Sequence, residues 1–249
     1  MTKSLSWALI GLLAMGTGIW AAAPGTEFEV ASMKRSTEGA PPGDTPRNMD
    51  NSPGHLAMHN VPLRFALEWA YDLKDYQIQC PEWMKFEEHY DIEARAAGGA
   101  TNDQMRPMLQ ALLLERLKMK VHVEKKEFSV YLLTRGNGPL KVKPAAGGDP
   151  SLSGGPNAAE FHNQPISRFT FLLTRRLDRP VLDRTGLDGV YDYSVDLSGL
   201  GFNGGMPQDT SAPSIFTTVQ RDMGLKLEAK KEMLDVLVID HAEKTPIEK

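Results

Sequence analysis

Apolar residues recur with helical spacing in two segments of the chain. A single helical face carries apolar residues at i, i+3, i+4 and i+7. The first segment places on such a face Leu63, Ala66, Leu67, Ala70 and Tyr71. The second segment, about a hundred residues later, does the same with Ile166, Phe169, Leu173 and Leu177. Each segment is therefore predicted to contain a helix that packs on a core.

The same order of further elements follows each helix. Alternating apolar and polar residues predict a strand at 90–94 and another at 191–197. A second helix comes next in each segment, once with the capping-box pair Thr101 and Gln104, and once from Pro213 to Gly224. Two strands then close each segment. They lie at 119–123 and 130–133 in the first segment, and at 225–227 and 236–239 in the second. Phe28-Glu29-Val30 adds a strand at the start.

Short motifs also recur at a nearly constant offset. His59-Asn60-Val61-Pro62 corresponds to His162-Asn163-Gln164-Pro165, and Tyr90-Asp91 corresponds to Tyr191-Asp192. In both copies we expect the asparagine to be the helix N-cap and the proline to lie in the first turn. The sequence thus predicts an α+β fold of two tandem helix-strand-helix-strand-strand copies, with a mixed or antiparallel sheet.

The predicted domain boundaries follow from these copies and from composition. We expect the first copy, with its extra strand, at 24–135 and the second copy at 157–249. Residues 136–156 are rich in Gly and Pro and are predicted to be the linker between them. Residues 1–23 have the order of a secretory signal: Lys3, an apolar run at 7–20, and small residues at 21–23. That run is short of the roughly 20 apolar residues that span a bilayer. We therefore expect signal cleavage and a periplasmic or secreted protein that does not span the membrane.

Charge and cysteine content restrict the partners and the chemistry. The chain has 28 basic and 32 acidic residues, and the two kinds alternate along the sequence. Nucleic-acid binding depends on clustered Lys and Arg, so no nucleic-acid partner is expected. The single cysteine, Cys80, cannot form an internal disulfide, and we interpret it as a small apolar residue before Pro81.

One segment links the chain to a known group of proteins. Residues 179–187 read Arg-Pro-Val-Leu-Asp-Arg-Thr-Gly-Leu, and Gly189, Tyr191 and Asp192 follow. This segment resembles a soil-associated, largely acidobacterial family of exported proteins of unknown function. The resemblance implies export and, in some relatives, attachment to membrane-bound peptidase-type sensors, but it implies no catalytic residues. More loosely, each helix-strand copy is similar to the short N-terminal interaction domains of secretins and TonB-dependent receptors.

The same segment supplies the candidate site. Asp183-Arg184-Thr185-Gly186 resembles the phosphorylated loop of cation-pumping ATPases, but no other part of such a pump is present. The alternative reading is a tight turn in which Asp183 accepts backbone N–H groups and Gly186 takes a positive φ. If the segment binds a ligand, the residues expected to contact it are Arg179, Asp183, Arg184, Thr185, Tyr191 and Asp192. A related hypothesis is that four arginines converge on an anionic ligand such as an acidic glycan, namely Arg168, Arg175, Arg179 and Arg184.

Other chemistries have weaker support. The histidines form no His-Glu-x-x-His motif, and the chain has no Gly-x-Ser-x-Gly, no Ser-x-x-Lys and no phosphate loop, so neither metal nor cofactor is expected. Two functions therefore stay open. The first is a non-enzymatic binding or interaction module for an envelope or extracellular ligand. The second is a hydrolase of envelope polymers that uses carboxylates near Asp183 and Asp192.

Overall fold

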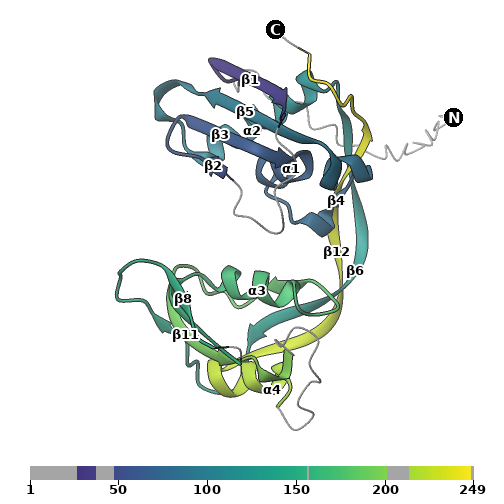
Figure 1. Cartoon of the computed structure of the whole chain (residues 1–249). Helices are drawn as coiled ribbons and strands as arrows, with labels where there is room; N and C mark the ends of the chain where they lie inside the picture. Colours follow the sequence, from purple (N-terminus) through teal and green to yellow (C-terminus); the bar gives the residue numbers. More distant parts are fainter. Residues whose placement is uncertain (1–26, 38–47, 156, 201–212, 248–249) are drawn as a thin grey trace, which may run out of the picture. The chain divides into compact units, whose positions relative to one another are not determined.

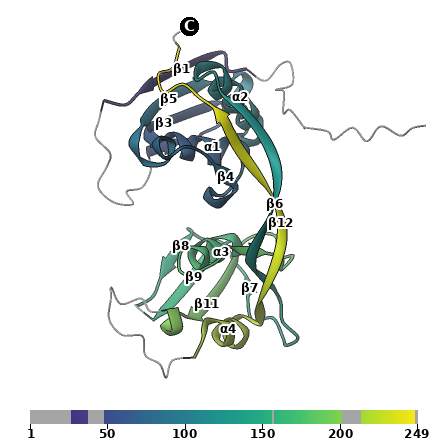
Figure 2. The same cartoon turned by 90° about the vertical axis from the view of Figure 1, so that its right-hand side faces the viewer.

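The computed structural model describes residues 27–37, 48–155, 157–200 and 213–247 (Figures 1 and 2). The predicted signal at 1–23 lies outside these residues. The chain divides into two compact units. The first comprises Met1–Lys126 and Asp235–Lys249, and the second is Glu127–Leu234. These boundaries differ from the expected ones, because residues 136–156 belong to the second unit and do not separate the units.

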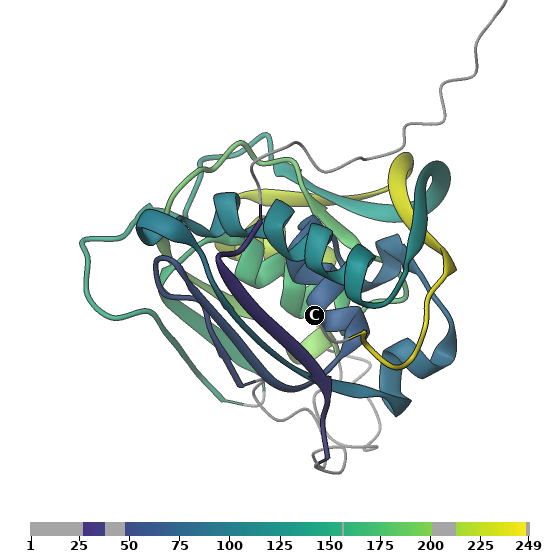
Figure 3. The ribbon, with the colours of Figure 1, turned by 90° about the horizontal axis from the view of Figure 1, so that it is seen from above.

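The first unit is built on an antiparallel sheet. Its strand order is β1-β5-β3-β2, with β1 at Val30–Arg35, β5 at His89–Arg95, β3 at His55–Pro62 and β2 at Asn48–Asp50. Helices α1 (Leu63–Tyr71) and α2 (Asn102–Arg116) pack on one face of this sheet (Figures 2 and 3). Short elements follow α1 and β5: η1 at Asp75–Gln77, β4 at Ile78–Gln79, η2 at Trp83–Glu87 and η3 at Ala97–Gly99.

The core of the first unit lies between this sheet and the two helices. Apolar side chains of the helix stripe predicted from the sequence are buried, including Leu63, Ala66, Leu67 and Ala70. They meet Met58 and Ile92 from the sheet and Leu109 from α2. Leu237 and Ile239, from the far end of the chain, belong to the same core. The first unit is therefore completed by the C-terminal strand.

The second unit contains its own antiparallel sheet, in the order β7-β11-β9-β8. These strands are β7 (Lys143–Pro144), β11 (Tyr191–Asp196), β9 (Ala158–Gln164) and β8 (Ser151–Ser153). The remaining elements are α3 (Ile166–Thr174), β10 (Val181–Asp183), η4 (Ser198–Leu200), α4 (Ile215–Thr218) and the π-helix η5 (Val219–Met223). Phe161 stacks on Tyr193 at 4.5 Å, and Phe169 meets both rings edge-on. These aromatic residues form the centre of the second core.

Two long strands replace the four short closing strands that the sequence predicted. β6 runs without a break over Lys120–Arg135, and β12 runs over Leu225–His241. They are hydrogen-bonded neighbours; β10 pairs in parallel with β6, and β4 pairs in parallel with β12. The polar residues in the middle of β6 predict an interruption of the strand. Instead its charges lie on an exposed ribbon, where Lys231 binds Glu127 at 2.7 Å.

The predicted asparagine N-caps were also wrong. Asn60 lies in β3 and Asn163 lies in β9, while the prolines Pro62 and Pro165 are the N-cap residues. Both asparagines have a left-handed backbone, with φ of 51° and 50°. Asparagine tolerates this conformation, which turns the end of the strand into the helix.

Each asparagine is held in the same way. The Asn60 N–H donates to Asp91 Oδ1 at 2.8 Å, and the Asn163 N–H donates to Asp192 Oδ1 at 2.9 Å. The same irregularity thus occurs at the two positions that the repeated motif matches. This correspondence supports the predicted duplication, which itself stays a prediction.

The predicted capping box of α2 and the predicted glycine end at Gly224 are confirmed, whereas the predicted helix start at Pro213 is wrong: α4 begins at Ile215, because the Ser214 side chain caps it by accepting the Thr217 N–H. The Thr101 N–H donates to Gln104 Oε1 at 2.9 Å at the start of α2, as expected for a capping box. Gly224 ends η5 with a left-handed φ of 70°. There a side chain would collide with the Pro139 carbonyl, which stands close to the glycine backbone. The fold is α+β, as the sequence predicted.

Candidate functional site

The Asp183–Gly186 segment forms a tight turn after β10. Asp183 Oδ1 accepts the Thr185 N–H at 2.8 Å and the Thr185 hydroxyl at 2.7 Å. Gly186 has a φ of 64°, which glycine adopts without strain. The Arg184 N–H donates to the Leu133 carbonyl of β6 at 2.8 Å. These contacts are those of the turn interpretation.

Thr185 links the turn to its surroundings. Its side chain is buried, and its hydroxyl accepts the Leu187 N–H at 3.1 Å. Arg135, at the end of β6, donates from Nε to the Thr185 carbonyl at 2.9 Å. The turn is thereby tied to β6 by side-chain and backbone hydrogen bonds. Asp183 and Thr185 stabilise the fold through these contacts.

Tyr191 and Asp192 have structural contacts of their own. The Tyr191 hydroxyl donates to the Asp188 carbonyl at 2.9 Å. Asp192 Oδ1 receives the Asn163 N–H and lies 3.9 Å from Nδ1 of His162. The contacts found for Asp183 and Asp192 therefore join each carboxylate to a different part of the unit, and none joins the two to each other.

The four arginines considered as an anion site divide into two groups. Arg179 lies over the Tyr131 ring at 5.4 Å and pairs with Asp178 at 3.1 Å. The Tyr131 hydroxyl donates to Asp178 Oδ1, and burial together with this hydrogen bond raises the pKa of Tyr131. Arg184 is exposed and donates to the carbonyl of its own neighbour Asp183. Arg179 and Arg184 thus each contact the residue that precedes them in the chain.

Arg168 and Arg175 do come together, on the exposed face of α3. With Phe171 they are spaced i, i+3 and i+7, which places three side chains on one face of a helix. The guanidinium carbons of Arg168 and Arg175 lie 5.8 Å and 5.9 Å from the centroid of the Phe171 ring. Both distances are within the range of a cation–π contact. The aromatic ring thus aligns two positive groups.

These three residues line a hollow of about 160 Å³, which we call the α3 hollow. Its other lining residues are Leu152 of β8, Leu172 and Arg176. Phe171 is 49% exposed and Leu152 is 43% exposed, which is high for large apolar side chains. None of the six lining residues is acidic. The α3 hollow is therefore lined by three guanidinium groups and two exposed apolar side chains.

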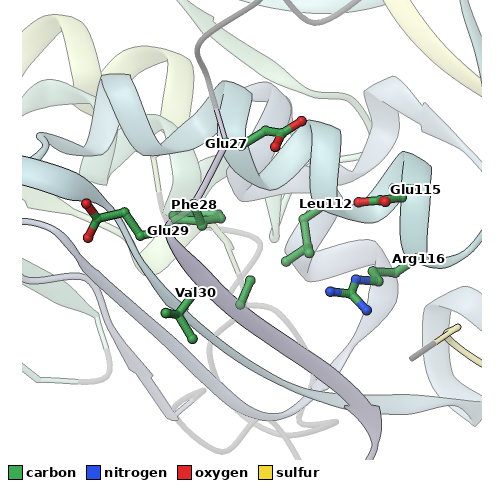
Figure 4. A pocket seen from close by; sticks show the side chains of 8 residues that line it. Glu27, Phe28, Glu29, Val30, Leu112, Glu115 and Arg116 are labelled. Carbon is green, nitrogen blue, oxygen red and sulfur yellow. The ribbon is translucent and has the colours of Figure 1, made fainter. Parts of the chain in front are cut away.

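The first unit has a pocket of a different character, between the start of β1 and the last turns of α2 (Figure 4). Its volume is about 360 Å³. Its lining includes Glu27, Glu29, Glu115 and one basic residue, Arg116. Arg116 donates from Nη1 to the Ile247 carbonyl at 3.0 Å. The pocket is thus predominantly acidic.

The histidines of β3 and the single cysteine, Cys80, all lie in the first unit. His55 and His59 both contact Glu93, at 3.6 Å and 3.1 Å. Across residues 27–37, 48–155, 157–200 and 213–247, no group of three or more His, Cys, Asp or Glu side chains has a geometry suited to a metal ion. Cys80 is half-buried against the first core, and burial raises the pKa of its thiol. A raised pKa leaves less of the reactive thiolate, which fits a packing role.

Sequence reasoning identified only part of the α3 hollow. Arg168 and Arg175 were named as anion-binding candidates, whereas Phe171, Leu152 and Arg176 were not. The signal for Phe171 was present, because an aromatic residue stands between two arginines at helical spacing. Leu152 gave no signal, since its position beside α3 depends on the short strand β8 pairing with β9.

The fold defines the class of this protein: an α+β protein with two compact units. Within the described ranges, no helix combines the length and the apolar composition of a membrane span. A family model described as a protein of unknown function (DUF3738) matches residues 64–242. Because the match covers more than half of the chain, the protein belongs to this family. No match was found among curated proteins or among solved structures.

Proposed function

We propose that this chain is an exported, non-enzymatic binding protein, and that its second unit binds an acidic glycan of the envelope or the surroundings at the α3 hollow. The observation that carries this proposal is the arrangement of Arg168 and Arg175 on either side of the exposed Phe171 ring. Export is proposed from the predicted signal at 1–23.

The chemistry of the α3 hollow favours an anionic ligand with an apolar face. Guanidinium groups bind carboxylates with two parallel hydrogen bonds, which gives both affinity and orientation. The Phe171 ring and Leu152 offer an apolar surface beside these cations. A uronic-acid unit has both properties, since its carboxylate lies at the edge of a ring with apolar C–H groups.

The size of the hollow favours a polymer over a free small molecule. Pockets for small ligands usually measure about 300–1,000 Å³ and enclose most of the ligand. The α3 hollow, at about 160 Å³, is smaller. It therefore suits one charged ring of a longer chain whose other units lie along the surface.

The contacts of the carboxylates argue for binding without turnover. Acid–base catalysis needs a carboxylate that can reach the substrate proton. Asp183 accepts two hydrogen bonds from Thr185, and Asp192 accepts the Asn163 N–H. This observation supports the binding hypothesis over the hydrolase hypothesis, which placed catalysis at these two residues.

The test is titration calorimetry with oligogalacturonate and oligomannuronate, with a neutral cello-oligosaccharide as the control ligand. We expect the acidic ligands alone to bind, more weakly as salt increases. Arg168→Gln with Arg175→Gln should weaken binding at least tenfold. Arg184→Gln removes one positive charge from the same unit outside the hollow, and should leave affinity within twofold.

Three results would contradict this proposal. One is the absence of binding to either acidic ligand at low salt. Another is an equal effect of the Arg184 variant and the double variant. The third is release of shortened products that Asp183→Asn abolishes while the unfolding midpoint stays unchanged, which would establish the hydrolase instead.

A further inference from the structure

Strand β1 differs from the other strands at sheet edges. In the described part of the chain, the sheets end at β1 and β2, at β10 and β4, and at β7 and β8. Five of these strands have two or three residues, whereas β1 has six. Short edge strands are one way in which proteins prevent pairing with another chain. β1 lacks this protection (Figure 1).

The backbone of β1 has hydrogen-bonding groups directed away from its neighbour. The Ser36 N–H donates to the His89 carbonyl at 2.8 Å, and the two chains run antiparallel. In such a ladder, alternate residues bond to the neighbouring strand. The even-numbered residues of β1 therefore face β5, and just before the strand the Glu29 N–H also donates to β5, at the Arg95 carbonyl at 2.8 Å. The N–H and C=O groups of Ala31, Met33 and Arg35 face outward.

The two ends of this segment carry opposite charges. Glu27 and Glu29 stand at the N-terminal end, and Lys34 and Arg35 stand at the C-terminal end. Lys34 lies 3.8 Å from Asp91, and Arg35 pairs with Glu88. The two basic side chains stay 76% and 50% exposed, so both can meet a further carboxylate.

We propose that β1 is a self-docking edge: a second copy of this chain adds its own β1 antiparallel to the first and forms a two-fold dimer. Antiparallel pairing brings the acidic end of one strand to the basic end of the other. A two-fold axis at Ala31 sets Glu27 opposite Arg35 of the second copy. An axis at Ser32 sets Glu29 opposite the same arginine. Either register pairs opposite charges, which stabilises cross-strand neighbours.

The acidic pocket of the first unit fits this arrangement. Glu27 and Glu29 both line it, together with Glu115 (Figure 4). Both registers therefore bring Arg35 of the second copy to the rim of this pocket. In the first register this guanidinium group lies beside Glu27, and in the second register it lies beside Glu29. The pocket and the free edge thus favour the same partner, one that carries a basic residue at the end of an extended strand.

The first experiment measures oligomeric state by light scattering across a concentration series, on the chain from residue 24 onward. We expect a dimer that dissociates on dilution. Ala31→Pro removes one outward N–H and leaves the bonds to β5 in place, since the Ala31 N–H does not face β5. It should raise the dimer dissociation constant at least tenfold. The matched variant Ala31→Ser keeps the N–H and should leave that constant within threefold.

The second experiment uses cysteine crosslinking in a Cys80→Ser background, and it does not depend on the proline variant. Residues opposite each other in an antiparallel pair have Cα atoms about 4.5–5.5 Å apart, within reach of a disulfide. Ala31→Cys or Ser32→Cys should therefore form a disulfide dimer under mild oxidation. Lys34→Cys is the control, because its counterpart would lie at least about 14 Å away along the strand.

The outcomes decide the proposal directly. A monomer at every concentration, with no crosslinking at residues 31 and 32 above the Lys34→Cys level, overturns it. A dimer that Ala31→Pro leaves intact and that none of the edge cysteines captures also overturns it, because the interface then lies elsewhere. Crosslinking at one of the two central positions, with none at residue 34, supports it and identifies the register.

Discussion

At the scale of single residues, three aspartates of this protein accept backbone N–H groups. Asp183 binds the N–H and the hydroxyl of Thr185, which is almost fully buried. Asp91 and Asp192 each hold the N–H of an asparagine in the left-handed conformation. These aspartates stabilise conformations that the backbone adopts rarely.

The turn at Asp183 gives the first prediction. Asp183→Ala should lower the free energy of unfolding by about 2 kcal/mol, because two hydrogen bonds to a charged acceptor are lost and the Thr185 hydroxyl stays buried. Asp183→Asn should cost less, since its amide oxygen can still accept. Urea unfolding at pH 7 measures both. Asp188→Ala, an exposed change in the same loop, should stay within about 0.5 kcal/mol. Equal stability of Asp183→Ala and the unmodified chain would refute the structural role of this carboxylate.

The asparagines show why the roles of single residues could be predicted only in part from the sequence. Asparagine is favoured at helix N-caps and also in the left-handed conformation, since its short amide bonds to nearby backbone in both. The sequence cannot separate the two cases at Asn60 and Asn163. Their partners, Asp91 and Asp192, lie about thirty residues away, and only the paired strands bring them close. Asp183 was easier to predict because its partner is two residues away.

At the scale of elements, ion pairs and a hydrogen bond join η5 to the end of β11. The Asp196 N–H donates to Asp222 Oδ2 at 3.0 Å, and Arg221 contacts both carboxylates at 3.2 Å and 2.6 Å. Hydrogen bonds from Ser198, and then from Arg221, lower the pKa of Asp196. The hydrogen bond with Arg221 lowers the pKa of Asp222. Both carboxylates are thus more acidic in the folded state than in the unfolded chain.

The lowered pKa values give a prediction with a defined sign. A carboxyl group with a depressed folded pKa contributes stability above its unfolded pKa, about 3.9 for Asp, and loses it as pH falls through the folded pKa. Arg221→Gln should therefore lower the urea midpoint at pH 7 and have a smaller effect at pH 3, below the unfolded pKa, where part of this contribution is lost. Arg184→Gln is the control and should show no such pH dependence. An Arg221 effect that is equal at both pH values would contradict this account.

The long strands mark the limit of element prediction. The sequence predicts one strand in each half of β6 and of β12, and the structure confirms these strand positions. Their continuity was missed because Glu-Lys-Lys-Glu at 124–127 lacks the apolar alternation of a strand that packs on a core. This ribbon is stabilised by partners across the strands, such as Lys125 with Asp235 at 2.8 Å. Such pairing depends on a residue more than a hundred positions away.

At the scale of the whole molecule, the chain enters and leaves the second unit through two adjacent strands. The crossings fall after Lys126 and before Asp235. Composition placed the boundary at 136–156 instead, because Gly and Pro are usual in linkers. In the structure, Val142 is buried there and the Lys141 N–H donates to the Met223 carbonyl. A segment can thus have the composition of a linker and still form part of a unit.

This organisation predicts different behaviour for two fragments. The core of the second unit lies entirely within residues 127–234, so this fragment should fold alone with one cooperative thermal transition. The fragment 24–126 lacks Leu237 and Ile239 of its core, and the Lys244 carbonyl that accepts the Tyr90 hydroxyl. It should be unfolded or weakly folded until a peptide of residues 235–249 is added.

Circular dichroism during heating measures both fragments. Cooperative unfolding of the fragment 24–126 at the temperature of the full chain would contradict the assignment of the last strand to the first unit. A fragment 127–234 without any cooperative transition would contradict the independence of the second core.

The path of β12 also sets the order in which the protein can mature. A ribosome releases residues from the N-terminus onward, and domains ordinarily fold in that order. Here the first unit needs Leu237 and Ile239, which emerge only after all of Glu127–Leu234 has been made. The later-synthesised unit is therefore the earlier one to be complete. Until then, the apolar side chains of the first core that pack on Leu237 and Ile239 stay uncovered.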